Sequence, residues 1–333
     1  MLNRRDMLLT TTAALAAAAA GPVAAQGRQK VTLLLNWYLY SEHAPFFLGK
    51  QRGYFEQEGI DLDIQEGRGA GVTVQAVAAG SAQFGYADVA TMIKAGARGA
   101  PVVAVGVLLQ TSPMAVMGFS EKNIKTPADI KGKTIVLTPG DSMSQVWPLM
   151  MQKTGLKETD FKILSGDAKT KMNALISGQA DLTMGYVMDQ PVKLLDATKK
   201  TVTTIRFADY GVNLVCSGIV VQKDFLKQNP DLVRRFMRAA TKSMEAAEKD
   251  PAAAVDAMLK ADPKSGVRDS LIGGMKQTVA LYHAPGVTSG QPYRVSAKVM
   301  DDSFDMLLKY GGLDKATAGK AEDYYTNDYL PAQ

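Results

Sequence analysis

The sequence predicts an α/β protein of two lobes. Its 333 residues exceed what one small core needs and fit roughly two domains. From residue 30, short strand-like runs alternate with helical stretches, a pattern typical of parallel β-α-β units. The segments AVAAGSAQFGYAD (76–88) and ALISGQADLTMGYVMD (174–189) also resemble each other, since each predicts a helix, a glycine turn and a strand ending in Gly-Tyr near an aspartate. Two lobes of similar topology would bring these strand ends to one cleft.

The first series of elements runs from residue 31 to residue 120. Apolar or alternating runs predict strands at 31–37, 60–66, 83–88, 101–110 and 114–120. Helices are expected between them, at 43–59, 71–80 and 92–99. Ser41 is a candidate N-cap for the first helix, and Pro45 falls in its first turn, where a proline loses no intrahelical hydrogen bond.

A second series repeats this order and then gives way to helices. Strands are expected at 133–140, 161–166, 180–186 and 214–222, and helices at 126–132, 142–155 and 169–178. Thr126 is a candidate N-cap for the first of these helices. After Asp224 the pattern predicts helices alone, at 230–249, 251–261, 268–282, 296–310 and 314–323.

The N-terminus, MLNRRDMLLTTTAALAAAAAGPVAAQ, predicts an export signal over residues 1–25. A charged start is followed by an apolar stretch and a small-residue end, with cleavage expected near Ala25. The pair Arg4-Arg5 resembles the twin-arginine signature. The apolar stretch of about 14 residues is shorter than the roughly 20 that a membrane span requires. We therefore expect a mature protein that is soluble in the periplasm.

Composition excludes several classes of function. The formal charge of +5 is spread along the chain without a block of like charges, which argues against a nucleic-acid partner. The single cysteine, Cys216, lies in the apolar run LVCSGIVV and is expected to be a buried thiol. With two histidines, a His/Cys metal cage is excluded, and common catalytic motifs are missing. We expect no catalytic residue, no metal and no cofactor.

The segment NWYLYSEHAPFF (36–47) concentrates aromatic residues just behind the first strand. Five residues, Asn36, Trp37, Tyr38, Tyr40 and His43, fall at or past the strand end, where an α/β lobe presents its ligand surface. Flat side chains suit flat ligands. Core packing is the alternative, evenly balanced for Trp37 and preferred for the helical Phe46 and Phe47. The candidate ligand contacts at this tip are Asn36, Trp37, Tyr38 and His43.

Two glycine-containing turns precede helices at corresponding places. In EGRGAGVTVQ (66–75) the candidates are Gly69, Ala70 and Gly71. In TPGDSMSQ (138–145) they are Gly140 and Ser142, and together with Pro139, Asp141 and Ser144 these could form a second cradle opposite the first. Free backbone N–H groups at a helix N-terminus can hold an anion. Tight turns that need glycine are the alternative.

The remaining candidates lie at other strand ends. Tyr186 ends the strand at 180–186, and Asp88 and Asp189 follow the two Gly-Tyr pairs. Asp88 is equally suited to cap the next helix. Gln110 lies beside the expected crossing between the lobes. We expect these four side chains to face the cleft.

A family resemblance covers nearly the whole mature chain. The segments NWYLYSEHAPFFLGKQRGYFEQEGIDLDI, GVTVQAVAAGSAQFGYAD, GAPVVAVGVLLQ and IKTPADIKGKTI resemble the periplasmic substrate-binding proteins of ABC importers, in the subfamily that serves nitrate, sulfonates, taurine and thiamin-pyrimidine precursors. The resemblance implies the two-lobed periplasmic-binding-protein fold (type II), with hinge crossover strands and a ligand cleft between the lobes. It implies one lobe from 28–115 and 222–333, and a second from 116–221.

The resemblance also implies a function. The chain would be a monomeric extracytoplasmic receptor that delivers a small molecule to a membrane ABC permease with a cytoplasmic ATPase. His43-Ala44-Pro45 is most similar to the pyrimidine-precursor binders, in which aromatics such as Trp37 flank a ring, and Glu42 and Asp189 could bond the amino groups of that ring. Alternatives are a sulfonate, taurine or nitrate binder, in which the turn at 69–73 contacts the anion, and a binder of an aromatic carboxylate or a flavin precursor. A pyrimidine-metabolising enzyme of the same fold is the rival class. A fungal enzyme of this kind uses a cysteine-rich cluster, which this chain lacks.

Overall fold

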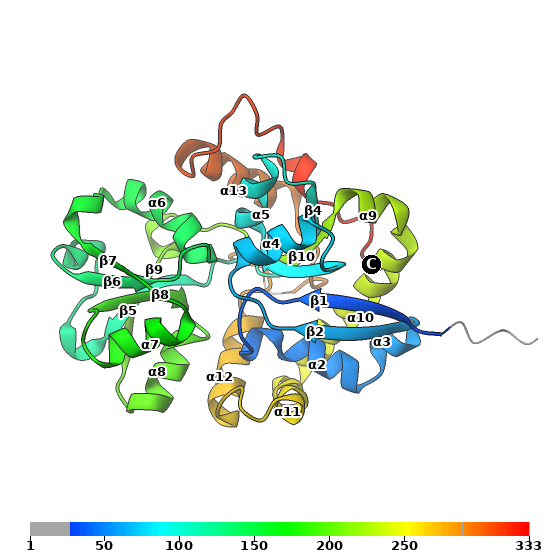
Figure 1. Cartoon of the computed structure of the whole chain (residues 1–333), viewed down its shortest axis with the longest axis horizontal. Helices are drawn as coiled ribbons and strands as arrows, with labels where there is room; N and C mark the ends of the chain where they lie inside the picture. Colours follow the sequence, from blue (N-terminus) through cyan, green and yellow to red (C-terminus); the bar gives the residue numbers. More distant parts are fainter. Residues whose placement is uncertain (1–26, 288, 333) are drawn as a thin grey trace, which may run out of the picture.

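The computed structural model describes residues 27–287 and 289–332, so the predicted export signal at 1–25 lies outside the described residues. Two five-stranded sheets form separate lobes side by side (Figure 1). The first sheet has the order β2-β1-β3-β10-β4, with β1 Gln29–Leu34, β2 Ile60–Gln65, β3 Phe84–Asp88, β4 Val102–Val107 and β10 Ser217–Gln222. The second has the order β7-β6-β8-β5-β9, with β5 Met114–Phe119, β6 Thr134–Leu137, β7 Lys162–Ser165, β8 Leu182–Tyr186 and β9 Val202–Arg206. The predicted α/β class and two-lobed fold are confirmed.

The two sheets repeat one topology. In each sheet three strands pair in parallel, and one strand inserted from the far side of the crossing runs antiparallel to its neighbours: β10 in the first sheet and β5 in the second. Because β10 pairs with β3 and β4, the chain has returned to the first lobe by Ser217. The expected border at residue 222 therefore falls too late.

Two crossing segments, 108–113 and 207–216, join the sheets. They bond to each other, because Cys216 N–H donates to the Leu109 carbonyl over 2.8 Å. Leu109 N–H in turn donates to the Ser217 carbonyl over 3.0 Å. Paired extended segments between two lobes form a hinge that can absorb a closing rotation.

Helices cover the faces of both sheets. In the first lobe these are α2 Ala44–Gln51, α3 Tyr54–Gln57, α4 Ala70–Ala78, α5 Val89–Gly96, α9 Lys223–Gln228, α10 Pro230–Lys249, α11 Pro251–Ala261, α12 Arg268–Val279 and α13 Ala297–Tyr310. In the second they are α6 Ser142–Thr154, α7 Ala168–Ile176 and α8 Gln190–Thr198. The apolar face of α10 is buried, and its Phe236 stacks on Phe84 of β3 with ring centroids 3.8 Å apart. Such aromatic burial contributes to stability beyond its area.

The helix expected at 43–59 is three pieces. A 3-10 turn, Ser41–His43, leads into α2, and Gly53 separates α2 from α3. Gly53 has φ of +71°, a left-handed conformation that ends a helix and favours glycine. Ser41 is not the N-cap of α2: His43 holds that position, and Ser41 Oγ has no partner among the residues described. Pro45 does lie in the first turn.

Three further element predictions differ from the structure. The segments 190–198 and 202–206 form α8 and β9, neither of which was predicted, although the β-branched run VTTI is a strand signal. Residues 314–323 do not form a helix; Gly319, with φ of +66°, interrupts the segment, and a 3-10 turn, Ala321–Tyr324, follows. The segment after Thr126 is a 3-10 turn, Pro127–Ile130, in which the Asp129 carboxylate accepts from Thr126 N–H over 2.8 Å.

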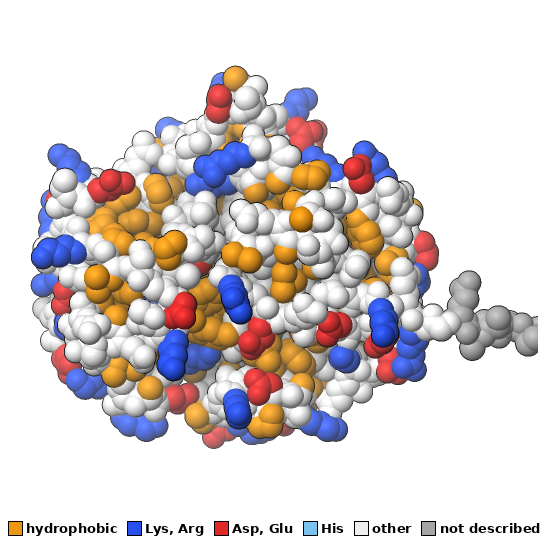
Figure 2. Space-filling view, in the orientation of Figure 1, with side chains coloured by type: hydrophobic (Ala, Val, Ile, Leu, Met, Phe, Trp, Pro, Cys, Tyr) orange, Lys and Arg blue, Asp and Glu red, His pale blue; other side chains and the backbone are white. Residues whose placement is uncertain are grey.

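The face shown in Figure 2 carries both signs of charge. Lys, Arg, Asp and Glu side chains are interspersed on the face shown in Figure 2. Within residues 27–287 and 289–332, no helix is long and apolar enough to cross a bilayer.

Candidate functional site

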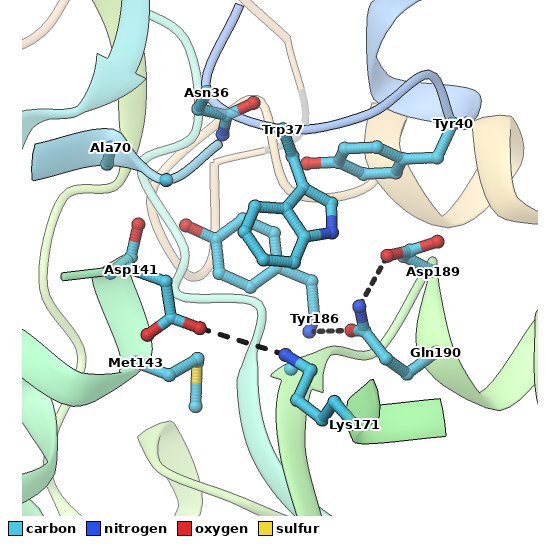
Figure 3. Close-up of a pocket in the computed structure, with 13 residues that line it drawn as sticks. Asn36, Trp37, Tyr40, Ala70, Asp141, Met143, Lys171, Tyr186, Asp189 and Gln190 are labelled. Atoms are coloured by element: carbon cyan, nitrogen blue, oxygen red, sulfur yellow. Dashed lines mark hydrogen bonds and ion pairs between the residues drawn. The ribbon is translucent and has the colours of Figure 1, made fainter. Parts of the chain in front are cut away.

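A small cavity of about 40 Å³ lies between the lobes (Figure 3). The first lobe lines it with Asn36, Trp37, Tyr40, Gly69 and Ala70, and the second with Asp141, Ser142, Met143, Lys171, Gly185, Tyr186, Asp189 and Gln190. A cavity of this size holds a few water molecules. A ring compound needs more room, so ligand entry requires the lobes to separate.

The cavity collects part of the predicted site. Of the candidates, it is lined by Asn36, Trp37, Gly69, Ala70, Ser142, Tyr186 and Asp189. Tyr38, His43, Gly71, Asp88, Gln110 and Gly140 lie outside its lining. Two further lining residues, Tyr40 and Asp141, belong to the strand tip and to the second glycine turn that the sequence singled out. The sequence did not indicate the other four: Met143, Lys171, Gly185 and Gln190.

The strand tip that carries Trp37 is held by its backbone. Gly67 N–H donates to the Trp37 carbonyl over 3.1 Å, and Gly69 N–H donates to the Asn36 carbonyl over 2.9 Å. The half-buried indole ring of Trp37 lies between the lobes (Figure 3), and Tyr186 lines the same cavity. Trp37 Nε1 has no hydrogen-bond partner in the described part of the chain. A buried indole N–H normally finds an acceptor.

His43 and Glu42 support this tip from behind. Both are fully buried. His43 Nε2 lies 2.8 Å from Asn36 Oδ1, and burial lowers the pKa of His43 to about 3. Glu42 accepts hydrogen bonds from the hydroxyls of Tyr40 and Tyr86. Burial raises the pKa of Glu42. The resemblance suggested that Glu42 reads a ligand, but its carboxylate is occupied by tyrosine hydroxyls.

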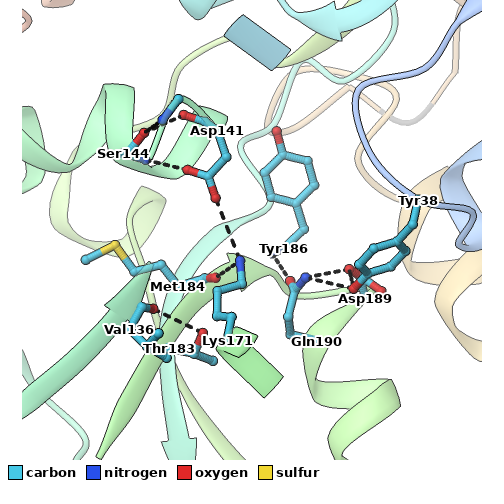
Figure 4. A network of polar contacts seen from close by, with 11 residues as sticks. Tyr38, Val136, Asp141, Ser144, Lys171, Thr183, Met184, Tyr186, Asp189 and Gln190 are labelled. Carbon is cyan, nitrogen blue, oxygen red and sulfur yellow. Dashed lines mark hydrogen bonds and ion pairs between the residues drawn. The ribbon is translucent and has the colours of Figure 1, made fainter. Parts of the chain in front are cut away.

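Tyr38 joins the first lobe to the second (Figure 4). Its hydroxyl donates to Asp189 Oδ2 over 2.8 Å and accepts from Gln190 Nε2 over 3.3 Å. Lys193 Nζ lies 3.4 Å from the centre of the Tyr38 ring and 3.6 Å from Asp189 Oδ1. Burial raises the pKa of Asp189, although Lys193 opposes the shift. Asp189 Oδ1 accepts no hydrogen bond from the residues that the structure describes.

A buried ion pair lines the second lobe's side of the cavity. Lys171 Nζ donates to the Met184 carbonyl over 2.9 Å and lies 3.7 Å from Asp141 Oδ2 (Figure 4). It also lies 5.1 Å from the centre of a Trp37 ring, within cation–π range. Burial lowers the pKa of Lys171 and raises that of Asp141, while each charge opposes the shift of the other. The sequence did carry a signal for Lys171, since it shares a helix face with Ala174 and Leu175, at positions expected to be apolar.

The two glycine turns meet. Gly71 N–H donates to the Gly140 carbonyl over 3.2 Å. Gly69 and Ala70 on one side, and Ser142 on the other, lie where the turns open into the cavity. The sequence predicts these turns as two facing cradles for an anion. In this closed arrangement one N–H of the first turn is used by the second.

The other candidates have separate roles. Asp88 is fully buried and caps α5 by accepting from Thr91 N–H over 2.6 Å, which was its alternative interpretation. Gln110 donates to the Arg294 carbonyl over 2.9 Å and lines a different groove. Cys216 is buried as expected, and its Sγ lies 3.0 Å from the Tyr186 hydroxyl. Over the described ranges no three His, Cys, Asp or Glu side chains are grouped as a metal site.

Comparison with known proteins identifies relatives of two kinds. The family model described as NMT1/THI5 like matches residues 40–254. A 4-amino-5-hydroxymethyl-2-methylpyrimidine phosphate synthase of Legionella pneumophila is 26% identical over 242 residues, which cover 71% of this chain and 75% of that protein. The riboflavin-binding protein RibY of Chloroflexus aurantiacus is 28% identical over 324 residues, which cover 93% of this chain and 88% of that protein.

Solved structures share the fold. The alkanesulfonate-binding protein SsuA of Xanthomonas axonopodis pv. citri, bound to MOPS, superposes with a TM-score of 0.69 at 18% identity, covering 89% of this chain and 98% of that one. The family match spans well over half of the sequence, and it agrees with the resemblance of the strand-tip motifs. The chain therefore belongs to the NMT1/THI5-like family and has the two-lobed fold of periplasmic substrate-binding proteins.

Proposed function

We propose that the protein is an extracytoplasmic receptor of an ABC importer that binds a small planar ring compound between its lobes. Residues 1–25 would direct its export, and the closed receptor would present its ligand to a membrane permease served by a cytoplasmic ATPase. The observation that carries the proposal is Trp37. Its ring lies in the inter-lobe cavity with an indole N–H that no described residue accepts. A stacked ring with an acceptor at its edge would satisfy both features.

The second lobe supplies the complementary contacts. Tyr186 lines the cavity opposite the strand tip, and Asp189 Oδ1 is an acceptor without a donor among the described residues. A ring that carries both an acceptor and an N–H donor would bond Trp37 and Asp189 together. Aminopyrimidines have this edge, and so does the ring system of flavins. Receptors of this kind need affinities near micromolar, about −8 kcal/mol, which one stacked ring and a few buried hydrogen bonds can supply.

The thiamin pyrimidine precursor is the first candidate ligand, and riboflavin is the second. The synthase relatives are named for a pyrimidine product, whereas RibY, named for riboflavin, matches this chain over 93% of its length. Sulfonate, taurine, nitrate or an aromatic carboxylate would suit the glycine turns better than the aromatic tip. An enzyme acting on a pyrimidine is the other class, and purified protein that produced or consumed the pyrimidine would establish it.

Ligand binding can be tested directly. Thermal shifts should be measured with 4-amino-5-hydroxymethyl-2-methylpyrimidine, riboflavin, methanesulfonate and nitrate, since a ligand at 100 times its Kd stabilises by about 2.7 kcal/mol. Trp37→Ala should weaken binding of the ring compound by about tenfold or more, because both the stacking surface and the N–H are lost. Titration calorimetry would give the affinities.

Two matched variants sharpen this test. Trp37→Phe keeps an aromatic face but lacks the N–H, so it should recover part of the affinity lost in Trp37→Ala. Trp147 is the chain's other tryptophan and is buried outside the cavity lining. A Trp147→Phe protein therefore reports Trp37 fluorescence alone, which a stacked ring should quench. A melting point that moves only with nitrate or methanesulfonate would refute the ring proposal.

A further inference from the structure

Three charged side chains line the inter-lobe cavity in nearly complete burial. Lys171, Asp141 and Asp189 have exposed fractions of 2%, 6% and 2%. Lys193, which is partly exposed, lies 3.6 Å from Asp189. The two carboxylates and the two ammonium groups therefore cancel. A proton passing between Lys171 and Asp141 would leave this sum at zero, so the balance does not depend on which partner holds it.

Two features of the second lobe would attract an anion, the N-terminus of α6 and the ammonium group of Lys171. The carboxylate of Asp141 offsets both. Its Oδ1 accepts from Ser144 N–H over 2.8 Å, so the positive N-terminal end of α6 already holds a carboxylate. Its Oδ2 lies 3.7 Å from Lys171 Nζ, so the buried cation already has a counter-charge. In the opposite turn one N–H group is likewise occupied, because Gly71 N–H donates to the Gly140 carbonyl.

An anionic ligand would therefore enter as an uncompensated charge. Once the lobes close, water cannot solvate it, and burial of an unpaired charge is costly. An uncharged ring can still use Trp37 Nε1 and Asp189 Oδ1, which have no hydrogen-bond partner in the described ranges. It can also take a remaining donor of Lys171, because an ammonium has three N–H groups and donates one to the Met184 carbonyl.

We infer that Asp141 is a specificity-determining residue that restricts the cleft to uncharged ligands and rejects anionic forms of the same ring. This inference rests on the proposed ring-binding function. It names the ligand's charge class and one residue responsible for it. It also predicts that Asp141→Asn opens the cleft to anions, because asparagine caps a helix as well as aspartate does but leaves Lys171 and the α6 terminus uncompensated.

The test compares a neutral ligand with its own anion. Affinities for 4-amino-5-hydroxymethyl-2-methylpyrimidine and its phosphate ester are measured by calorimetry, and riboflavin with riboflavin 5′-phosphate covers the second candidate ligand. The unaltered protein should prefer the unphosphorylated form by at least about tenfold, and Asp141→Asn should narrow the preference by about tenfold. Lys171→Met should increase the preference for the unphosphorylated ligand, since this variant leaves Asp141 without its cation.

Asp250→Asn is the matched control. Asp250 caps α11 by accepting from Ala253 N–H over 3.0 Å and is exposed outside the cavity lining, so this variant should keep the original preference. An equal preference in Asp141→Asn and the unaltered protein would overturn the inference, as would tight binding of the phosphate ester, methanesulfonate or nitrate by the unaltered protein. Ring binding would stand after the first of these results. If neither ring compound binds, the proposed function itself fails.

Discussion

At the scale of single residues, the strand tip divides into side chains that reach the cavity and side chains that support them. Asn36 and Trp37 line the cavity, whereas His43 lies behind Asn36 and bonds its side-chain oxygen. Local sequence predicted that this cluster belongs to a ligand surface. It could not separate the two roles, because the direction of each side chain depends on the turn at 41–43 and on the burial of its neighbours.

His43 should make stability depend on pH. Its pKa is about 3 in the folded protein, against an ordinary value of 6.5, because burial disfavours the charged ring. Below pH 6.5 the His43 imidazole binds a proton in the unfolded chain but not in the folded chain. The contribution of neutral His43 to the free energy of unfolding is therefore fully present above pH 6.5 and is lost as the pH falls toward 3. About 2 kcal/mol of it is lost by pH 5. Urea unfolding at pH 7.5 and pH 5 measures it.

His43→Gln isolates this contribution from the buried carboxylates, which titrate in both proteins. The variant should lose about 2 kcal/mol less than the unaltered protein between pH 7.5 and pH 5. Identical pH dependence in His43→Gln and the unaltered protein would show that His43 does not carry the effect.

At the scale of elements, the glycine turns before α4 and α6 form a contact between the lobes. A Cβ atom on Gly71 would lie 2.8 Å from the Gly140 carbonyl oxygen, closer than real Cβ contacts occur. The backbone of Gly71 is otherwise helical, as part of α4. Glycine at position 71 allows the two lobes to approach each other. From the sequence alone, the turn that contains it is predicted as an anion cradle.

Gly71→Ala should weaken ligand binding without weakening the fold. Alanine favours the helix by up to about 1 kcal/mol, but its methyl group obstructs the closed state. We expect an unchanged or higher free energy of unfolding together with about a tenfold loss of ligand affinity. Gly273→Ala in α12 is the control, since a Cβ there meets no atom within 4 Å and should leave affinity intact. Equal affinities in the two variants would rule out the turn contact as a determinant of closure.

Element prediction succeeded where the signal is local. The cap at Asp88 and the amphipathic α10 follow from residue type and spacing. The helix expected at 43–59 breaks at Gly53, and the one expected at 314–323 contains Gly319; both glycines adopt positive φ. The strand β9 was missed because no glycine, proline or asparagine marks the turn between α8 and β9. The turn is made by Lys199, which adopts φ of +60° although lysine does not favour that conformation.

At the scale of the whole molecule, polar contacts hold the lobes together. Besides the Tyr38–Asp189 bond, Lys94 Nζ donates to the Gln145 carbonyl over 2.8 Å, and Ser270 Oγ donates to Asp196 Oδ1 over 2.6 Å. The contacts lie at separate places along the interface between the lobes, and each of them, here called a latch, stabilises the closed arrangement against the hinge motion that would open it. A ligand that binds the closed state adds to them.

Tyr38→Phe should shift the ligand-free protein toward the open state. It removes the hydroxyl bonded to Asp189 and Gln190 and keeps the ring beneath Lys193. A hydrogen bond to a charged group contributes about 1.5–3 kcal/mol, so the open population should rise by about tenfold or more. Small-angle scattering should report a larger radius of gyration without ligand. Tyr54→Phe, whose hydroxyl contacts Arg52 in the same lobe, should leave it unchanged. A Tyr38→Phe protein as compact as the unaltered one would contradict the latch.

The sequence by itself determined the two α/β halves, the strand ends that carry cavity-lining residues, and the aromatic tip, because hydrophobic period, caps and turn residues act over a few positions. Only the tertiary structure decided which residues meet. Tyr38 and Asp189 are 151 residues apart, and Lys171 meets Asp141 and Trp37 through the arrangement of three elements. Such contacts depend on the hinge geometry and on how far the lobes close, and no local pattern encodes either.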